Sequence, residues 1–210
     1  MAAIEFDHVL IAVTDLAEAE RTFAERHGLV SIEGGRHPGW GTANRIVPLG
    51  DAYLELIAVV DEREAIESML GRWVAGNATA SGHLLGWAVR PPNLDEVAQR
   101  LGLEAVPGSR ATPTGEVIRW RTVGVDHVAD DPSLPFFIER AQGAPFPGAG
   151  TAPVATVSRL DIRGSSDALS AWLGDHSLPI RVLAGSPGIA SVVLASEYGP
   201  IVLGEPPGAA

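Results

Sequence analysis

Two histidines and two glutamates stand in apolar, strand-like segments of this 210-residue chain. His8 lies in the run FDHVLIAV and His83 in HLLGWAV, while Glu55 lies in YLELI and Glu139 in FFIER. A carboxylate in such a run must reach solvent, a cation or a metal, because an unpaired buried charge is costly. Two imidazoles and two carboxylates suit a divalent ion such as Zn, Ni, Mn or Fe, with positions left for water or substrate. The ion would polarise a carbonyl or enediolate oxygen, and Glu55 or Glu139, on leaving it, could act as a general base. The sequence therefore predicts a metal site and catalytic carboxylates.

The register of the second histidine departs from this pattern. Val13 lies five residues after His8, whereas Val89 lies six residues after His83. Aligning the two valines puts Leu84 at the ligand position, and a slip of one residue turns a side chain to the opposite face of a sheet. A β-bulge would restore His83 to the predicted site.

Each of the four residues also has a purely structural interpretation. His8 can be a hydrogen-bonded core histidine, and His83 a capping or packing residue. Glu55 can be half of a buried ion pair, with Arg45 or Arg119 as partner. Glu139 and the next residue, an arginine, can form part of a surface pair.

The glycine-rich segment 34–41 and the residues after it offer a second kind of chemistry. His37, Trp40, Thr42 and Asn44 supply an imidazole, an aromatic wall and two hydrogen-bonding side chains. This mixture is typical of a small-molecule pocket, so we expect these four residues to bind substrate. Alternatively, the glycines only permit tight turns and Trp40 covers an edge of the core. No P-loop is present, because the lysine and the following helix are missing.

A repeated unit positions these residues. A strand over 6–13 is followed by Asp15 as an N-cap and by a helix that ends at Gly28, and a strand over 83–89 is followed by Asn93 and Gly102 in the same order. A fainter third copy has a strand over 154–162, Ser166 as a cap and Gly174 as the stop. One leucine on the apolar face of each predicted helix, Leu16, Leu94 and Leu169, recurs at nearly equal intervals, which indicates internal duplication.

Further strands follow each predicted helix. In the first two units they cover 29–33, 43–49, 53–60, 103–106, 116–122 and 135–141. One helix for every three or four strands predicts an α+β fold with mixed or antiparallel sheets and outer helices. We expect paired βαβββ modules at 5–60 and 82–142, joined by a bridging helix over 62–74 and together forming a domain over 5–142. A partial third unit should cover 151–204.

Composition excludes several classes of partner. The net charge is −11 and no Lys/Arg cluster occurs, so neither nucleic acid nor an anionic membrane surface is an expected partner. The chain lacks a signal-peptide pattern and a membrane-length apolar run, which leads us to expect a cytoplasmic protein. It contains no cysteine, which excludes disulfides, thiolate metal sites and cysteine nucleophiles.

The opening segment, with Asp7-His8-Val9 and then Asp15-Leu16, resembles the opening motif of the vicinal-oxygen-chelate superfamily, which includes lactoylglutathione lyases, extradiol dioxygenases, epimerases and metal-free antibiotic-binding proteins. A His on the first strand and a Glu on the last strand of each paired module is similar to that superfamily's metal site. The segment 34–45 followed by Tyr53-Leu54-Glu55-Leu56 is similar to a glyoxalase-like subgroup. The resemblance covers 5–142 well and implies curved mixed sheets around a cavity.

Three functions follow as hypotheses. The first is a metal-dependent lyase, isomerase or dioxygenase that acts on a small carbonyl or hydroxylated compound. The second is a metal-free protein that binds or sequesters a small molecule in the same cavity, with His37 and Trp40 as contacts. The third is a structural or interaction module. The resemblance makes a homodimer plausible under all three.

Overall fold

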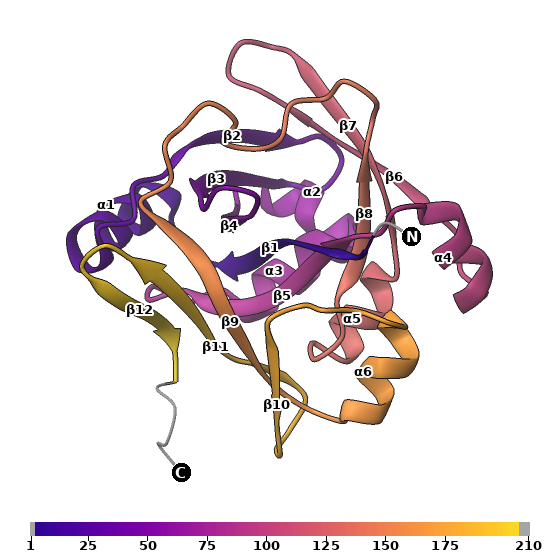
Figure 1. The fold of residues 1–210 in the computed structure, drawn as a ribbon. Coiled ribbons are helices and arrows are strands. Elements are labelled where there is room, and N and C mark those ends of the chain that lie inside the picture. Colours follow the sequence, from indigo (N-terminus) through magenta and orange to yellow (C-terminus); the bar gives the residue numbers. More distant parts are fainter. Residues whose placement is uncertain (1–2, 206–210) are drawn as a thin grey trace.

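The computed structural model describes residues 3–205, and eight of its strands close into a barrel (Figure 1). Around the barrel the strand order is β1-β4-β3-β2-β6-β7-β8-β5. The bounds are β1 Glu5–Ala12, β2 Ile32–His37, β3 Thr42–Pro48, β4 Tyr53–Val59, β5 His83–Arg90, β6 Val106–Ala111, β7 Val117–Val123 and β8 Phe136–Arg140.

The barrel consists of two halves with the same internal order. In the first half β1 pairs in parallel with β4, and in the second half β5 pairs in parallel with β8. The remaining neighbours in each half are antiparallel, and β1 pairs antiparallel with β5 to join the halves. The predicted α+β fold of paired βαβββ modules, in a curved mixed sheet, is confirmed.

The helices of the two halves begin and end as the cap residues predict. Helix α1 (Leu16–His27) begins at Asp15, whose side chain accepts a hydrogen bond from the Glu18 backbone, and ends at Gly28 with a φ of 66°. Helix α4 (Leu94–Leu101) begins at Asn93 and ends at Gly102 in the same left-handed conformation. Glycine adopts this conformation without steric cost, so it ends both helices in the same way.

Three local predictions were wrong. The bridging segment forms two helices, α2 (Glu62–Glu67) and α3 (Met69–Asn77), because Ser68 is extended and its hydroxyl accepts from the Gly71 backbone to begin the second helix. Strand β2 runs through the paired glycines at 34 and 35, several residues later than predicted. Helix α5 (Val125–Asp130), between β7 and β8, was not predicted.

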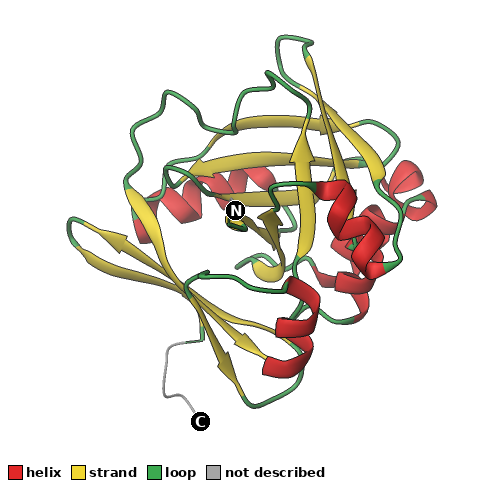
Figure 2. Cartoon of the chain, turned by 45° about the vertical axis from the view of Figure 1, so that its right-hand side comes forward, coloured by secondary structure: helices red, strands yellow, loops and turns green. Residues whose placement is uncertain are grey.

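The third unit forms a separate four-stranded sheet in the order β10-β9-β11-β12, which lies beneath the barrel in Figures 1 and 2. Its helix α6 begins at Ser165, one residue before the predicted cap, and ends at Gly174. The division of the chain at residues 142–151 stays a prediction. The elements are β9 Ala155–Arg163, α6 Ser166–Leu173, β10 Ile180–Leu183, β11 Gly188–Ser196 and β12 Gly199–Gly204.

Apolar side chains form two clusters, one on each face of the barrel wall. The outer cluster joins the wall to α1, α4 and the small sheet, and includes Val9, Leu54 and Phe137 together with Leu160 of β9. The inner cluster lies inside the barrel and includes Leu10, Ile57, Phe136 and Ile138. Alternation along each strand therefore sends neighbouring residues to opposite faces. Within residues 3–205 no helix is long and apolar enough to cross a membrane.

Candidate functional site

The pairing of β1 with β4 brings His8 and Glu55 together inside the barrel. Leu10 is the register partner of Glu55, and His8 lies one pleat away on the same face. The His8 Nε2 atom is 3.4 Å from Glu55 Oε2, and both side chains are buried. The sequence-predicted association of these two residues is present in the structure.

A third residue, Asp7, orients the imidazole. The register between β1 and β5 shifts between Phe6 and His8, which is the irregularity expected of a β-bulge and re-aims the side chain at the extra position. Asp7 Oδ1 lies 2.5 Å from His8 Nδ1, and the Tyr53 ring stacks on the imidazole with 4.6 Å between centroids. A carboxylate only accepts, so Nδ1 donates to Asp7 and Nε2 is directed at Glu55.

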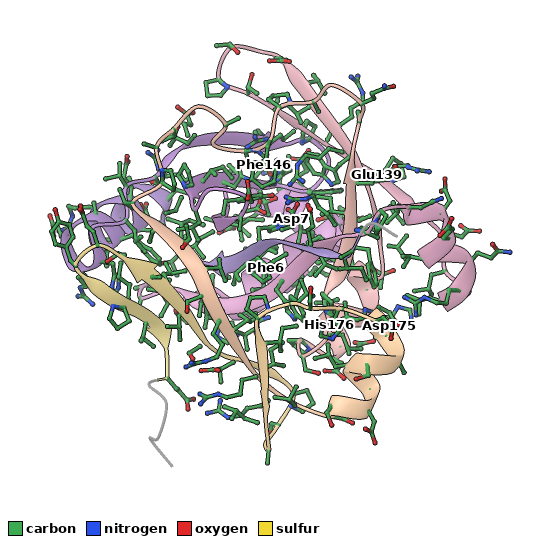
Figure 3. The ribbon with its side chains drawn as sticks, viewed as in Figure 1. Phe6, Asp7, Glu139, Phe146, Asp175 and His176 are labelled. Atoms are coloured by element: carbon green, nitrogen blue, oxygen red, sulfur yellow. The ribbon has the colours of Figure 1, made fainter. Side chains whose placement is uncertain are left out.

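Asp7 is fully buried and remains ionised because guanidinium groups surround it. Arg140 donates to both Asp7 oxygens at 2.7 Å, and Arg90 donates to Oδ2 at 2.9 Å. Burial alone would raise the pKa of Asp7, but hydrogen bonds from Arg140 and His8 and their charges hold it well below the ordinary value. Figure 3 shows Asp7 in the middle of the molecule close to Phe146, whose ring lies under the Arg90 and Arg140 guanidiniums. The anion is therefore permanent over the physiological range.

Tyr53 shares this buried network. Its hydroxyl accepts a hydrogen bond from Arg140 at 3.1 Å. Burial raises the pKa of the Tyr53 phenol well above its ordinary value, and the Asp7 charge adds to the rise. Tyr53 therefore stays neutral beside the imidazole.

On its other side Glu55 meets two of the predicted substrate-binding residues, and a third bonds to one of them. Asn44 Nδ2 donates to Glu55 Oε1 at 2.6 Å, and His37 Nε2 is 3.8 Å from the same oxygen. Thr42 Oγ1 is 2.9 Å from His37 Nδ1. Burial lowers the pKa of His37 and the Arg110 charge lowers it further, while Glu55 opposes the change. His37 is thus a neutral imidazole at neutral pH.

These polar groups face a cavity of about 420 Å³ whose walls are mainly aromatic and aliphatic. Trp40 and Trp120 meet edge to face with 6.0 Å between ring centroids, and His37 lies 5.7 Å from Trp40. This volume and this lining are typical of sites for small organic molecules. The apolar wall includes Leu10, Trp40, Ile46, Ile57, Trp73, Ile118, Trp120, Phe136 and Ile138.

His83 and Glu139 do not join the site, so the predicted four-residue metal set was wrong. β5 has an irregularity near Leu85, but His83 stands opposite Ala12, is exposed and does not line the cavity. Glu139 shares the phase of Phe137, which faces the outer core, and its carboxylate pairs with Arg121 at 2.5 Å. Figure 3 places Glu139 away from Asp7.

Within residues 3–205, no three histidine, aspartate or glutamate side chains converge closely enough to hold an ion. A structural or catalytic metal usually needs at least three protein ligands. The residues present therefore do not fit the metal centre that the sequence resemblance implied. The catalytic role predicted for Glu139 is also wrong, because its carboxylate is outside the cavity.

Sequence reasoning missed three charged residues of this region: Asp7, Arg110 and Arg140. Arg140 lines the cavity because it lies on the same face of its strand as Phe136 and Ile138. The alternation of side chains along this strand, which turns Glu139 outward, could therefore have predicted that Arg140 faces the cavity. Asp7 is one position out of phase and reaches the imidazole only through the β1 irregularity. Arg110 lies on β6, which runs over Val106–Ala111 and not over the predicted 103–106, so no predicted strand included it.

Comparison with known proteins identifies the family. The model of the glyoxalase-like domain matches residues 6–177, which is most of the chain. The chain belongs to this glyoxalase-like domain family. The glyoxalase-like relationship that residues 34–45 and 53–56 indicated is therefore confirmed. No curated protein matches the sequence.

One solved structure supports the fold of this glyoxalase-like protein, and two others are more distantly similar. A hypothetical protein from Staphylococcus aureus is 15% identical, with a TM-score of 0.71 over 92% of this chain and 91% of its own. Methylmalonyl-CoA epimerase from Mycobacterium tuberculosis is 20% identical, with a TM-score of 0.46 over 65% and 86% of the two chains. The Streptomyces coelicolor epimerase with 2-nitronate-propionyl-CoA is 18% identical, with a TM-score of 0.48 over 68% and 100%. Only the first likeness extends over nearly the whole barrel and small sheet.

Proposed function

We propose that this glyoxalase-like protein is an isomerase-type enzyme that moves a proton at a carbon next to the carbonyl group of a small molecule. The observation that carries the proposal is the Asp7–His8–Glu55 series, which ends in a mainly apolar cavity. A catalytic base needs a fixed position and a path for the proton that it removes, and this series supplies both.

The chemistry needs two proton transfers. Glu55 Oε2 removes a proton from the carbon, and the electron pair of the C–H bond moves to the carbonyl oxygen to form an enolate. The proton passes to His8 Nε2, 3.4 Å away, and the resulting imidazolium is stabilised by the Asp7 carboxylate on the other ring nitrogen. Return of the proton to a different atom or face of the enolate completes the isomerisation.

The lyase and dioxygenase versions of the sequence-based hypothesis depend on metal ligands that His83 and Glu139 do not supply. The isomerase version needs only residues that share the cavity. It also uses the substrate-binding predictions, since Asn44 and His37 lie beside Glu55 and Trp40 forms part of the cavity wall. Thr42 lies behind them, with its hydroxyl 2.9 Å from His37 Nδ1. Cytoplasmic location and homodimer formation stay predictions.

The test is carbon–hydrogen exchange in D₂O, followed by proton NMR, for a panel of small ketones, aldehydes and oxo acids. We expect the protein to accelerate exchange for at least one class of compound. Glu55→Gln keeps the shape of the side chain but removes the base, so exchange should slow by roughly 10²- to 10⁴-fold. Glu139→Gln is the matched control, because the same chemical change is made outside the cavity, and it should leave the rate unchanged.

A second candidate function is metal-free binding of a small molecule, which the paired tryptophans favour. Ligand binding beside Trp40 and Trp120 would change their fluorescence. If compounds bind by this measure but none exchanges a proton faster than in buffer, the binding function replaces the isomerase function.

A further inference from the structure

Arg110 is a buried cation without a partner in the same cavity. It lies on β6, is 8% exposed and lines the cavity wall. Its Nη1 atom has no hydrogen-bond partner, and its guanidinium forms no ion pair with any of the residues described. Burying a charge without compensation is costly, so a guanidinium left in this state requires an external anion to offset the cost.

Other guanidiniums that are shielded from solvent have carboxylate partners. Arg140 binds Asp7, Arg45 binds Glu20, and Arg90 binds both Asp7 and Glu5. Arg140 also lines the cavity, but Asp7 neutralises its charge. Of the two arginines that line the cavity, Arg110 is therefore the one without a carboxylate partner among residues 3–205.

Asn44 lies close to both Arg110 and the proposed base, Glu55. Its Nδ2 donates to Glu55, while its Oδ1 has no partner. The side chains of Asn44 and Arg110 both lie against Gly34, which has no side chain to displace them. A Cβ at position 34 would be 2.0 Å from Asn44 Oδ1 and 2.8 Å from Arg110 Nη1, so only glycine leaves room for both. Arg110 and Glu55 thus lie on either side of one asparagine side chain, so a small molecule can reach both.

We propose that Arg110 binds the carboxylate of the substrate, which makes the substrate class small oxo acids. The planar guanidinium matches a carboxylate in two parallel hydrogen bonds. A dianionic phosphate fits less well, because one free cation faces it and the Glu55 carboxylate shares the cavity. The carbonyl end of the oxo acid then lies toward Glu55, and the apolar remainder packs against the Trp40 and Trp120 rings. This last step rests on the proposed isomerase function, whereas carboxylate binding by Arg110 does not.

The experiment compares three probes by titration calorimetry: phenylpyruvate, its methyl ester and inorganic phosphate. The acid should bind the wild-type protein more tightly than the ester, which lacks the charge. Arg110→Gln should weaken binding of the acid by roughly 30-fold or more and leave the ester nearly unchanged. Glu55→Gln should still bind the acid, so loss of exchange with retained binding separates failure of the base from failure of the anion site.

A melt without ligand gives a second readout. If Arg110 were a structural residue, Arg110→Gln would lower the melting temperature. We expect the temperature to stay equal or rise, because the change removes an unpaired buried charge. The proposal is overturned if the acid and ester bind alike, if phosphate binds more tightly than the acid, if none of the three binds at millimolar concentration, or if Arg110→Gln melts lower than the wild type.

Discussion

The two halves of the barrel have the same strand order but contribute different chemistry to the cavity. From its strands the first half supplies buried imidazole and carboxylate groups, those of His8, His37 and Glu55 on β1, β2 and β4. The strands of the second half supply two guanidiniums, those of Arg110 and Arg140, and both halves supply aromatic and aliphatic walls. Three exposed residues of the second half, Glu104, Asp126 and His127, line the cavity from outside the strands. A duplicated backbone therefore does not require a duplicated site. The same strand position can carry an apolar side chain in one half and a hydrogen-bonded polar side chain in the other, since both can be buried at little cost.

The difference is clearest between β4 and β8, the last strands of the two halves. In β4, Leu54 and Leu56 face the outer core and Glu55 faces the cavity. In β8, Phe137 faces the outer core and Phe136 and Ile138 face the cavity, so Glu139 points outward. Each half thus has a glutamate on the corresponding strand, but only the glutamate of the first half lies in the site.

The largest effect should come from the buried anion of the first half. Asp7→Asn removes the charge that Arg140 and Arg90 bind, which leaves at least one buried guanidinium without compensation. We expect a loss of about 3–5 kcal/mol in the free energy of unfolding, measured in denaturant melts. Asp95→Asn is the control from the second half, because its carboxylate is 70% exposed and pairs with Arg121 at the surface. Equal losses in the two variants would contradict the difference between the halves.

A smaller effect should be visible in acid. The pKa of Asp7 is held well below its ordinary value of 3.8 in the folded protein. The stabilisation is therefore complete above pH 3.8 and is lost as the pH falls from there toward the folded-state pKa. Wild-type protein should lose stability over this window, and Asp7→Asn should lose less. Parallel pH profiles of the two melts would show that other carboxylates dominate acid unfolding.

The smallest effect should come from the glutamate outside the cavity. Glu139→Gln breaks a pair with Arg121 in which both side chains are about two-fifths exposed, 39% and 41%. Water and salt screen such a pair, so the loss of unfolding free energy should be at most about 1 kcal/mol. A thermal melt at low and at high salt measures it, and the difference from wild type should shrink in salt. A loss as large as that of Asp7→Asn would mean that the outer pair is part of the core.

The sequence by itself determined the repeated strand, cap, helix and glycine, because Asp15 with Gly28 and Asn93 with Gly102 are local signals that act within a few residues. The alternation of Leu54 and Leu56 also left only the other face of the strand for the Glu55 carboxylate, while the family resemblance implied that this strand lies beside the strand of His8. Tertiary structure decided the membership of the site. His83 and Glu139 were excluded by strand register and phase, and Asp7 was brought to the imidazole by an irregularity between β1 and β5. Arg110 entered the cavity from a strand that packs beside Gly34, which lies about a third of the chain away. Pairing between distant strands sets these contacts, and the local residue pattern does not encode which strand will lie opposite.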